Sequence, residues 1–176
     1  MGNLLFSPSG RISHSQLIKG ALIVSALLFV IKALPLVSVP VAGIAAIIGL
    51  VLIYCWVALF IKRAHDAGKS GWLSIIPVLL IVLVGMFVIE PLMQGMFAGD
   101  EMAAVQNMAA EAAEAGDFGA IMSAATGPEA TALAKAAALP VAAGRFIFSM
   151  LVAFLFSLLM KSDPGDNQYG PATPMG

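Results

Sequence analysis

The chain alternates four long apolar segments with shorter polar ones. Each apolar segment reaches the roughly 20 residues that a helix needs to cross a hydrocarbon core of about 30 Å. The predicted spans are Leu17–Val37, Val39–Ile61, Trp72–Phe97 and Leu139–Met160. Pro35 and Pro40 separate the first two and favour a tight hairpin. Because a spanning helix satisfies its own backbone groups, the pattern predicts an all-α polytopic membrane protein with four transmembrane helices.

The composition supports this class. The chain has 176 residues, of which 60% are hydrophobic and 11% charged, and its mean hydropathy is +0.98. A soluble domain carries roughly 25% charged residues, so a water-soluble globule is excluded. The formal net charge of −1 gives no indication of nucleic-acid binding. A single cysteine, Cys55, allows no intrachain disulfide and no cysteine-based zinc site. We expect one membrane domain over residues 1–176.

The basic residues predict an orientation. Six of the nine fall on one side of a four-span arrangement: Arg11, Lys19, Lys62, Arg63, Lys69 and Lys161. By the positive-inside rule, both termini and the Lys62–Gly71 loop are expected on the cytoplasmic side of the membrane, with Trp72 as an interfacial anchor. The first apolar segment is too long for the core of a signal peptide and is expected to remain as a span.

The segment between the third and fourth spans, Ala98–Ala138, is acidic and rich in alanine. It holds six acidic residues, one basic residue and seventeen alanines. We expect one helix over Asp100–Ala115, ended by Gly116, and another beginning near Pro128, with Thr126 and Glu129 in capping-box spacing. The segment is interpreted either as a helical cap on the protein's own outer surface or as a docking surface for a partner. Insertion into the membrane surface fits less well, because interfacial helices favour basic and bulky apolar residues.

Three short polar stretches carry a family resemblance. They are Gly10-Arg11 before the first span, Arg63-Ala64-His65-Asp66-Ala67-Gly68-Lys69-Ser70-Gly71-Trp72 between the second and third, and Gly165-Asp166-Asn167-Gln168-Tyr169-Gly170-Pro171 after the fourth. Together they resemble the bacterial inner-membrane family known as domain of unknown function 805. The Ala98–Ala138 segment is longer than expected for that family, and Ala64 and Leu73 replace bulkier residues. The resemblance implies a small helical membrane protein and no particular activity.

The polar stretches allow two interpretations. Arg63 and Asp66 are three apart and can pair at the end of a helix, while Gly68 permits a tight turn, which suggests a structural role. Alternatively, Arg11, Arg63 and Lys69 bind an anionic lipid headgroup or a phosphate. The candidate cluster is Arg11, Arg63, His65, Asp66, Lys69, Trp72 and Asn167. His65 and Asp66 lack the further ligands that a metal site needs, so no metal, cofactor or catalytic set is expected.

Three charged residues fall within the predicted spans. At a rise of about 1.5 Å per residue, Lys32, Glu90 and Arg145 lie at similar depth near the outer interface. Either their side chains extend to the outer surface, or Glu90 and Arg145 pair between the third and fourth spans. Few other polar residues lie at mid-depth, which makes an ion path poorly supported.

These observations favour a non-catalytic protein that works by binding. We expect an accessory or assembly subunit of a larger bacterial inner-membrane complex, in contact with phospholipids and with a partner protein. The rival is a lipid-binding or small-molecule transport protein that uses the cytoplasmic arginine, histidine, aspartate and lysine cluster.

Overall fold

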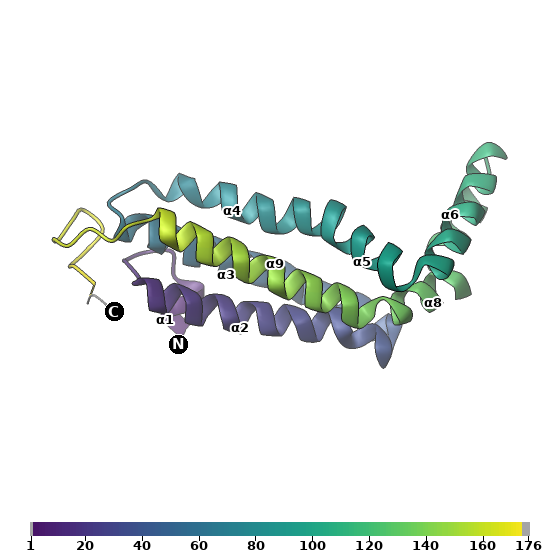
Figure 1. Cartoon of the computed structure of the whole chain (residues 1–176), viewed down its shortest axis with the longest axis horizontal. Coiled ribbons are helices and arrows are strands. Elements are labelled where there is room, and N and C mark those ends of the chain that lie inside the picture. The colour runs from purple at the N-terminus through teal and green to yellow at the C-terminus, as the bar shows by residue number, and fades with distance from the viewer. Residues whose placement is uncertain (1, 174–176) are drawn as a thin grey trace.

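The computed structural model describes residues 2–173 and has four long helical segments that lie side by side (Figure 1). They are α2 (His14–Ala33) with the 3₁₀ turn η1 (Leu34–Leu36), α3 (Val39–Asp66), a composite third segment (Gly71–Phe97), and α9 (Ala138–Leu159). All four are long and apolar enough to cross a membrane. The described residues contain no strand, so the predicted all-α class with four candidate spans is confirmed.

The two ends of the bundle differ. One end carries both ends of the described chain, the short helix α1 (Gly2–Phe6) and the turn between α3 and the third segment; we call it the terminal end (Figure 1). The other, the distal end, carries the η1 turn and three further helices: α6 (Gly99–Glu114), α7 (Phe118–Thr126) and α8 (Pro128–Ala136).

Local sequence signals set the helix boundaries. Ser13 accepts a hydrogen bond from the Gln16 amide, and the Gln16 side chain accepts one from the Ser13 amide, which completes a capping box at the start of α2. Pro35 lies in η1, and Ser38 caps α3 by accepting from the Val41 amide. The predicted hairpin between the first two spans is therefore built by a proline turn and a serine cap.

The core lies where α2, α3 and α9 meet. Helix α9 packs mainly against α2, and α2 also packs against α3. Trp56 stacks on Phe60, which meets Phe156 of α9 edge to face. A Cβ added at Gly20 of α2 would lie 2.5 Å from Leu59 Cδ2, so this glycine lets α2 and α3 approach closely. Large apolar side chains elsewhere on the bundle face outward, as they do in lipid-facing helices.

The third segment is not a uniform α-helix. It comprises η2 (Gly71–Ser74, 3₁₀), α4 (Ile75–Leu79), η3 (Leu80–Ile89, π-helical) and α5 (Glu90–Phe97). Its first part packs against α3, whereas η3 packs against α9 and hardly touches α3. The third segment and α3 therefore diverge toward the distal end. A π-helical stretch is rare and often marks a functional site.

The distal segment departs in part from the sequence-based expectation. Helix α6 matches the predicted first helix, and Gly116, with a φ of +66°, follows its end. The predicted capping box at Thr126 is wrong, because Gly127 is the residue that precedes α8 and the Thr126 hydroxyl donates to the Met122 carbonyl. Between α6 and α8 lies α7, a helix that the sequence pattern did not predict. Asp117 caps it by accepting a hydrogen bond from the Ala120 amide.

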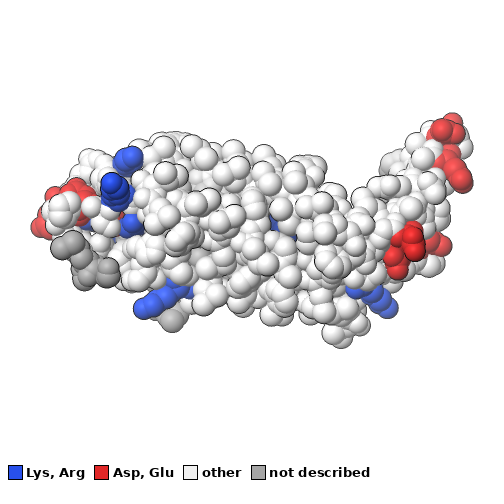
Figure 2. Space-filling model, viewed as in Figure 1, with Lys and Arg blue, Asp and Glu red and all other residues white. Residues whose placement is uncertain are grey.

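Charged side chains lie mostly at the two ends. Figure 2 shows a broad band of the bundle surface with almost no charge, and acidic side chains on the segment that projects from the distal end. A largely uncharged belt between charged ends is what a bilayer-spanning protein presents.

Candidate functional site

Asp66 is the centre of a buried polar cluster at the terminal end. Its side chain is inaccessible to solvent and receives hydrogen bonds from three partners. Oδ2 accepts from Arg63 Nη1 at 2.7 Å, while Oδ1 accepts from Arg11 Nε at 3.2 Å and from the Thr173 hydroxyl at 2.7 Å. Two cations and a hydroxyl thus compensate the burial of one carboxylate.

Arg11 ties the N-terminal stretch to the segment after α9. Its Nη2 donates to the Asp163 carbonyl at 2.6 Å, and its Nη1 donates to the Gly165 carbonyl at 2.7 Å and to the Gly170 carbonyl at 3.3 Å. The side chain is almost fully buried. Every terminal nitrogen of this guanidinium therefore has an acceptor within the protein.

Arg63 joins α3 to the end of α9. Its Nη2 donates to the carbonyls of Ser157 and Met160, and its Nη1 also donates to the Ser162 hydroxyl at 2.9 Å. The last carbonyls of a helix have no partner within the helix and carry partial negative charge. The Arg63 guanidinium consequently caps α9 while it neutralises Asp66.

His65 and Asn167 complete the contact between α3 and the C-terminal segment. The Asn167 amide donates to the His65 carbonyl at 3.1 Å, and the rings of His65 and Tyr169 stack with centroids 3.8 Å apart. The ring nitrogen Nδ1 of His65 lies 3.3 Å from the Gly10 carbonyl. The three polar stretches found in the sequence therefore meet at one place, although the first and last are about 150 residues apart.

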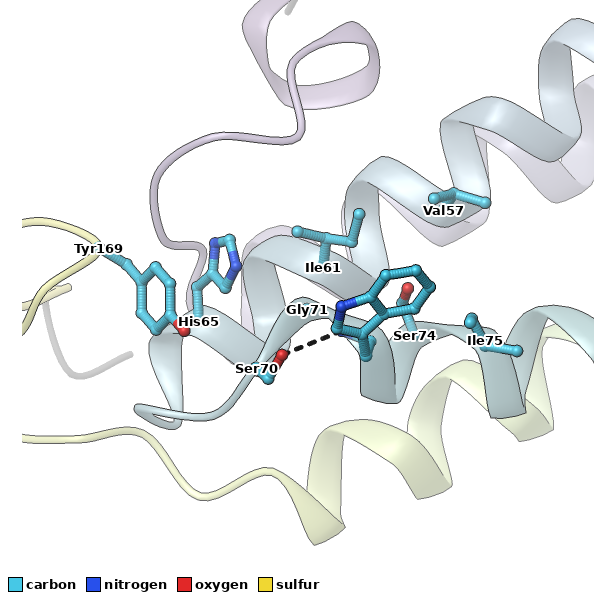
Figure 3. A pocket seen from close by; sticks show the side chains of 9 residues that line it. Val57, Ile61, His65, Ser70, Gly71, Ser74, Ile75 and Tyr169 are labelled. Atoms are coloured by element: carbon cyan, nitrogen blue, oxygen red, sulfur yellow. Dashed lines mark hydrogen bonds between the residues drawn. The ribbon is translucent and has the colours of Figure 1, made fainter.

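A pocket of about 450 Å³ opens beside the stacked rings (Figure 3). His65 and Tyr169 lie at one end of it, Val57 and Ile75 at the other, and Ile61 between them (Figure 3). Ser70, Gly71 and Trp72 also line it. The pocket is open and its lining carries no full charge apart from any proton on His65, which suits an uncharged or aromatic group better than a phosphate.

The structure does not bring every residue of the candidate cluster together. Lys69 is exposed in the turn and lies outside the hydrogen-bond network, and Trp72 is 79% exposed at the pocket rim. In contrast, Lys62 is buried and donates to the Asn3 carbonyl at 2.8 Å and to the Leu4 carbonyl, holding α1 against α3. The sequence pointed to Lys62 only as one of the basic residues that set the orientation, because no pattern in it predicted a helix over residues 2–6.

A second cluster, which we call the ion triplet, lies between the helices nearer the distal end. Lys32 Nζ is 2.6 Å from Glu90 Oε1, and Arg145 Nε is 3.7 Å from the same oxygen. One of the two interpretations from the sequence was a pair between Glu90 and Arg145. The structure places these two side chains beside each other, but the closer partner of Glu90 is Lys32. The helical rise correctly predicted that all three residues lie at similar depth. It did not predict that Lys32 is the cation nearest to Glu90.

We call the polar cluster around Asp66 the terminal cluster. Its internal hydrogen bonds leave few groups that could bind a ligand. Among residues 2–173, no group of three or more histidine, cysteine, aspartate or glutamate side chains is placed to hold a metal ion. Arg11 and Arg63 direct their terminal nitrogens to protein acceptors, and of the nitrogens of these two guanidinium groups Arg63 Nε alone is buried without a partner among the described residues. The cluster is arranged to hold segments together rather than to receive a charged ligand.

Four apolar spans and an internally bonded polar cluster define a helical membrane-type protein. The family model described as Protein of unknown function (DUF805) matches residues 5–171. The chain belongs to that family, as its polar stretches suggested. No curated protein and no solved structure matches it.

Proposed function

We propose that the protein is a non-catalytic accessory or assembly subunit of a bacterial inner-membrane complex, and that α6, α7 and α8 form its recognition surface. We call these three helices the distal hairpin. The observation that carries the proposal is their placement. They pack on one another; α8 rests on the bundle against η1, α3 and α9, and α6 meets it at α5.

A simple cap would cover the end of the bundle. Helix α6 instead meets the spans mainly at the adjoining α5 and extends away from the bundle axis (Figure 1). Phe118, at 73% exposure, and Met122 present apolar surface on α7. A long connection with its own helices and exposed apolar residues is typical of a functional loop.

The charge of the distal hairpin supports a partner with a basic face. Ala98–Ala138 has a formal charge of −5, and none of its acidic residues forms an ion pair within the described residues. Their side chains lie on the projecting segment (Figure 2). Such a surface steers a partner with a basic face, and the association weakens as salt screens the charges.

The orientation is part of the proposal. The terminal end carries most of the basic residues, so the positive-inside rule puts it in the cytoplasm and the distal hairpin on the outer side of the inner membrane. The partner would then be a periplasmic protein or the outer face of another membrane protein.

Site-specific photo-crosslinking in intact cells tests this proposal. A photoreactive side chain at Met122 should give one adduct of discrete mass. Neutralising three exposed acids, Asp100→Asn, Glu111→Gln and Glu114→Gln, should remove the adduct while the protein level is unchanged. A matched control that changes exposed neutral residues, Gln106→Ala, Asn107→Ala and Ser123→Ala, should keep it. An adduct that survives neutralisation, or no adduct at all, contradicts a charge-guided recognition surface.

The rival use of the terminal cluster for lipid or small-molecule binding has less support. Arg11 and Arg63 are occupied by protein acceptors, which leaves Lys69 as the accessible cation of that set. Within the bundle, the hydroxyls of Ser25 and Ser149 are 2.8 Å apart and satisfy each other, so they do not begin a polar path.

A further inference from the structure

A cavity lies between α2, α3 and η3 toward the distal end, and Arg145 of α9 also lines it. Its volume is about 530 Å³, within the range of about 300–1,000 Å³ found for ligand pockets. The wall is almost entirely apolar and includes Leu28, Ile53, Trp56, Ile81 and Met86. We call it the intramembrane cavity, because every lining residue lies within or between candidate spans.

The cavity follows from the divergence of two helices. Helix α3 packs against η2 and α4 near the terminal end but hardly touches η3. Small residues line α3 where the helices separate: Ala42, Ala46 and Gly49. A Cβ added at Gly49 would meet no atom within 4 Å, so the space beside it is open.

One part of the cavity wall is charged. Lys32, Glu90 and Arg145, the ion triplet, all line it. Two cations face one carboxylate, which leaves a formal charge of +1 in an apolar environment where uncompensated charge is costly. Lys32, with 36% of its side chain exposed, reaches the opening, whereas Arg145 is further inside.

Two buried donors beside the cavity have no acceptor. Arg145 Nη1 and the indole nitrogen of Trp56 are both inaccessible and unpartnered among the described residues, and Trp56 is 1% exposed. A Cβ at Gly85 would lie only 1.7 Å from Arg145 Nη1, so the guanidinium fills the space beside this glycine of the π-helical η3. Protein atoms cover both nitrogens, so neither faces the open space, and the ion triplet is the polar feature that the cavity presents to a ligand.

We propose that the intramembrane cavity binds one acyl chain of an anionic glycerophospholipid, whose phosphate group or glycerol ester oxygens lie at Lys32 and Arg145. The apolar wall accepts the chain, the net positive charge selects an anionic headgroup, and the headgroup oxygens accept from the partly exposed Lys32 ammonium. The bilayer supplies this ligand directly to a cavity that lies between spans. This site is separate from the terminal cluster and independent of the distal hairpin.

Fluorescence quenching of Trp56 tests the proposal. The chain has two tryptophans, so Trp72→Phe leaves Trp56 as the only one, and Trp72 does not line this cavity. The full-length protein is reconstituted in phosphatidylcholine vesicles that contain a small fraction of lipid with brominated acyl chains. Because bromine quenches indole on contact, we expect brominated phosphatidylglycerol to quench Trp56 more strongly than the same fraction of brominated phosphatidylcholine.

Matched glycine variants test whether the lipid occupies the cavity. Gly49→Phe fills the cavity and should reduce quenching by brominated phosphatidylglycerol to the level of phosphatidylcholine. Gly43→Phe places the same side chain on α3 outside the cavity, also where an added Cβ meets no atom within 4 Å, and should leave quenching unchanged.

Matched lysine variants test the headgroup selection. Lys32→Gln should abolish the preference for the anionic lipid, whereas Lys19→Gln, an exposed change at the other end of α2, should preserve it. Equal quenching by both lipids in the unmodified cavity overturns the proposal. Equal effects of the two glycine variants, or of the two lysine variants, overturn it as well.

Discussion

The Asp66 carboxylate holds the Arg11 guanidinium across 55 positions of the chain, with Arg11 Nε 3.2 Å from Oδ1. The other carboxylate oxygen binds Arg63 one helical turn earlier in α3. A single residue thus fixes the N-terminal stretch, the end of the second span and, through both arginines, the segment after α9. The stability of the terminal end should depend on Asp66 more than on any exposed charge.

Removing Asp66 should be strongly destabilising. Asp66→Ala leaves two buried guanidinium groups without their counter-charge, and breaking a buried ion pair from one side costs about 3–5 kcal/mol. The double variant with Arg63→Ala should cost less than the sum of the two single changes, as measured by thermal unfolding in detergent. Lys69→Ala, in the exposed turn, should stay within about 0.5 kcal/mol of the unmodified protein. Strictly additive losses would show that Arg63 and Asp66 do not interact.

The C-terminal segment should be anchored by the stack of Tyr169 on His65. Tyr169→Ala removes this contact while the backbone bonds of Arg11 remain, so the segment should open more often and trypsin should cut faster after the exposed Lys161. Gln168→Ala, an adjacent exposed change, is the control and should leave the cleavage rate unaltered. Identical rates for the two variants would mean that the stack contributes nothing to anchoring.

Opposite ends of the bundle should label from opposite sides of the membrane. Ser123 in α7 and Ser70 in the turn after α3 are both exposed and can each be changed to cysteine. In intact spheroplasts, a membrane-impermeant maleimide should modify the cysteine at position 123 and spare the one at position 70 until the membrane is opened. Labelling of position 70 alone would reverse the orientation.

Glu90 should matter more to the bundle than either of its cations. Glu90→Gln leaves Lys32 and Arg145 facing each other without a carboxylate, whereas Lys32→Gln leaves a balanced Glu90–Arg145 pair. We therefore expect the lower unfolding temperature for Glu90→Gln, since an unpaired charge within a span is costly. Arg145→Gln should also cost less than Glu90→Gln, because it leaves the closer Lys32–Glu90 pair balanced. An equal effect of all three changes would show that the triplet is not coupled.

The fold was predictable because it depends on long apolar runs. Those runs set four spans whose ends the structure shifts by a few residues, for example from Leu17 to His14 at the first. The π-helical stretch Leu80–Ile89 was not predictable, because it accompanies the packing of Arg145 against Gly85, a contact between two spans 60 residues apart. Local sequence carries no sign of such a contact.

The candidate site was predictable by residue type but not by role. Clustered polar residues in an apolar chain marked Arg11, Asp66 and Asn167, and the spacing of Arg63 and Asp66 indicated their pairing. The carbonyl acceptors of the two arginines left no sequence signal, because any residue supplies a carbonyl. Thr173 was missed for a related reason: a hydroxyl near a chain end becomes a partner of Asp66 only after the segment folds back.

The capping of α9 by Arg63 has a consequence for biogenesis. Arg63 is synthesised about 94 residues before the Ser157 carbonyl that it binds. Until the fourth helix has been inserted, the ribosome-bound chain carries a positively charged side chain at the end of its second helix with no acceptor from α9. A message truncated before the codon for Ser157 would therefore yield a protein in which Asp66 still balances the Arg63 charge but the guanidinium N–H groups lack their acceptors from α9. Membrane proteases that recognise exposed polar groups could then distinguish incomplete chains from finished ones.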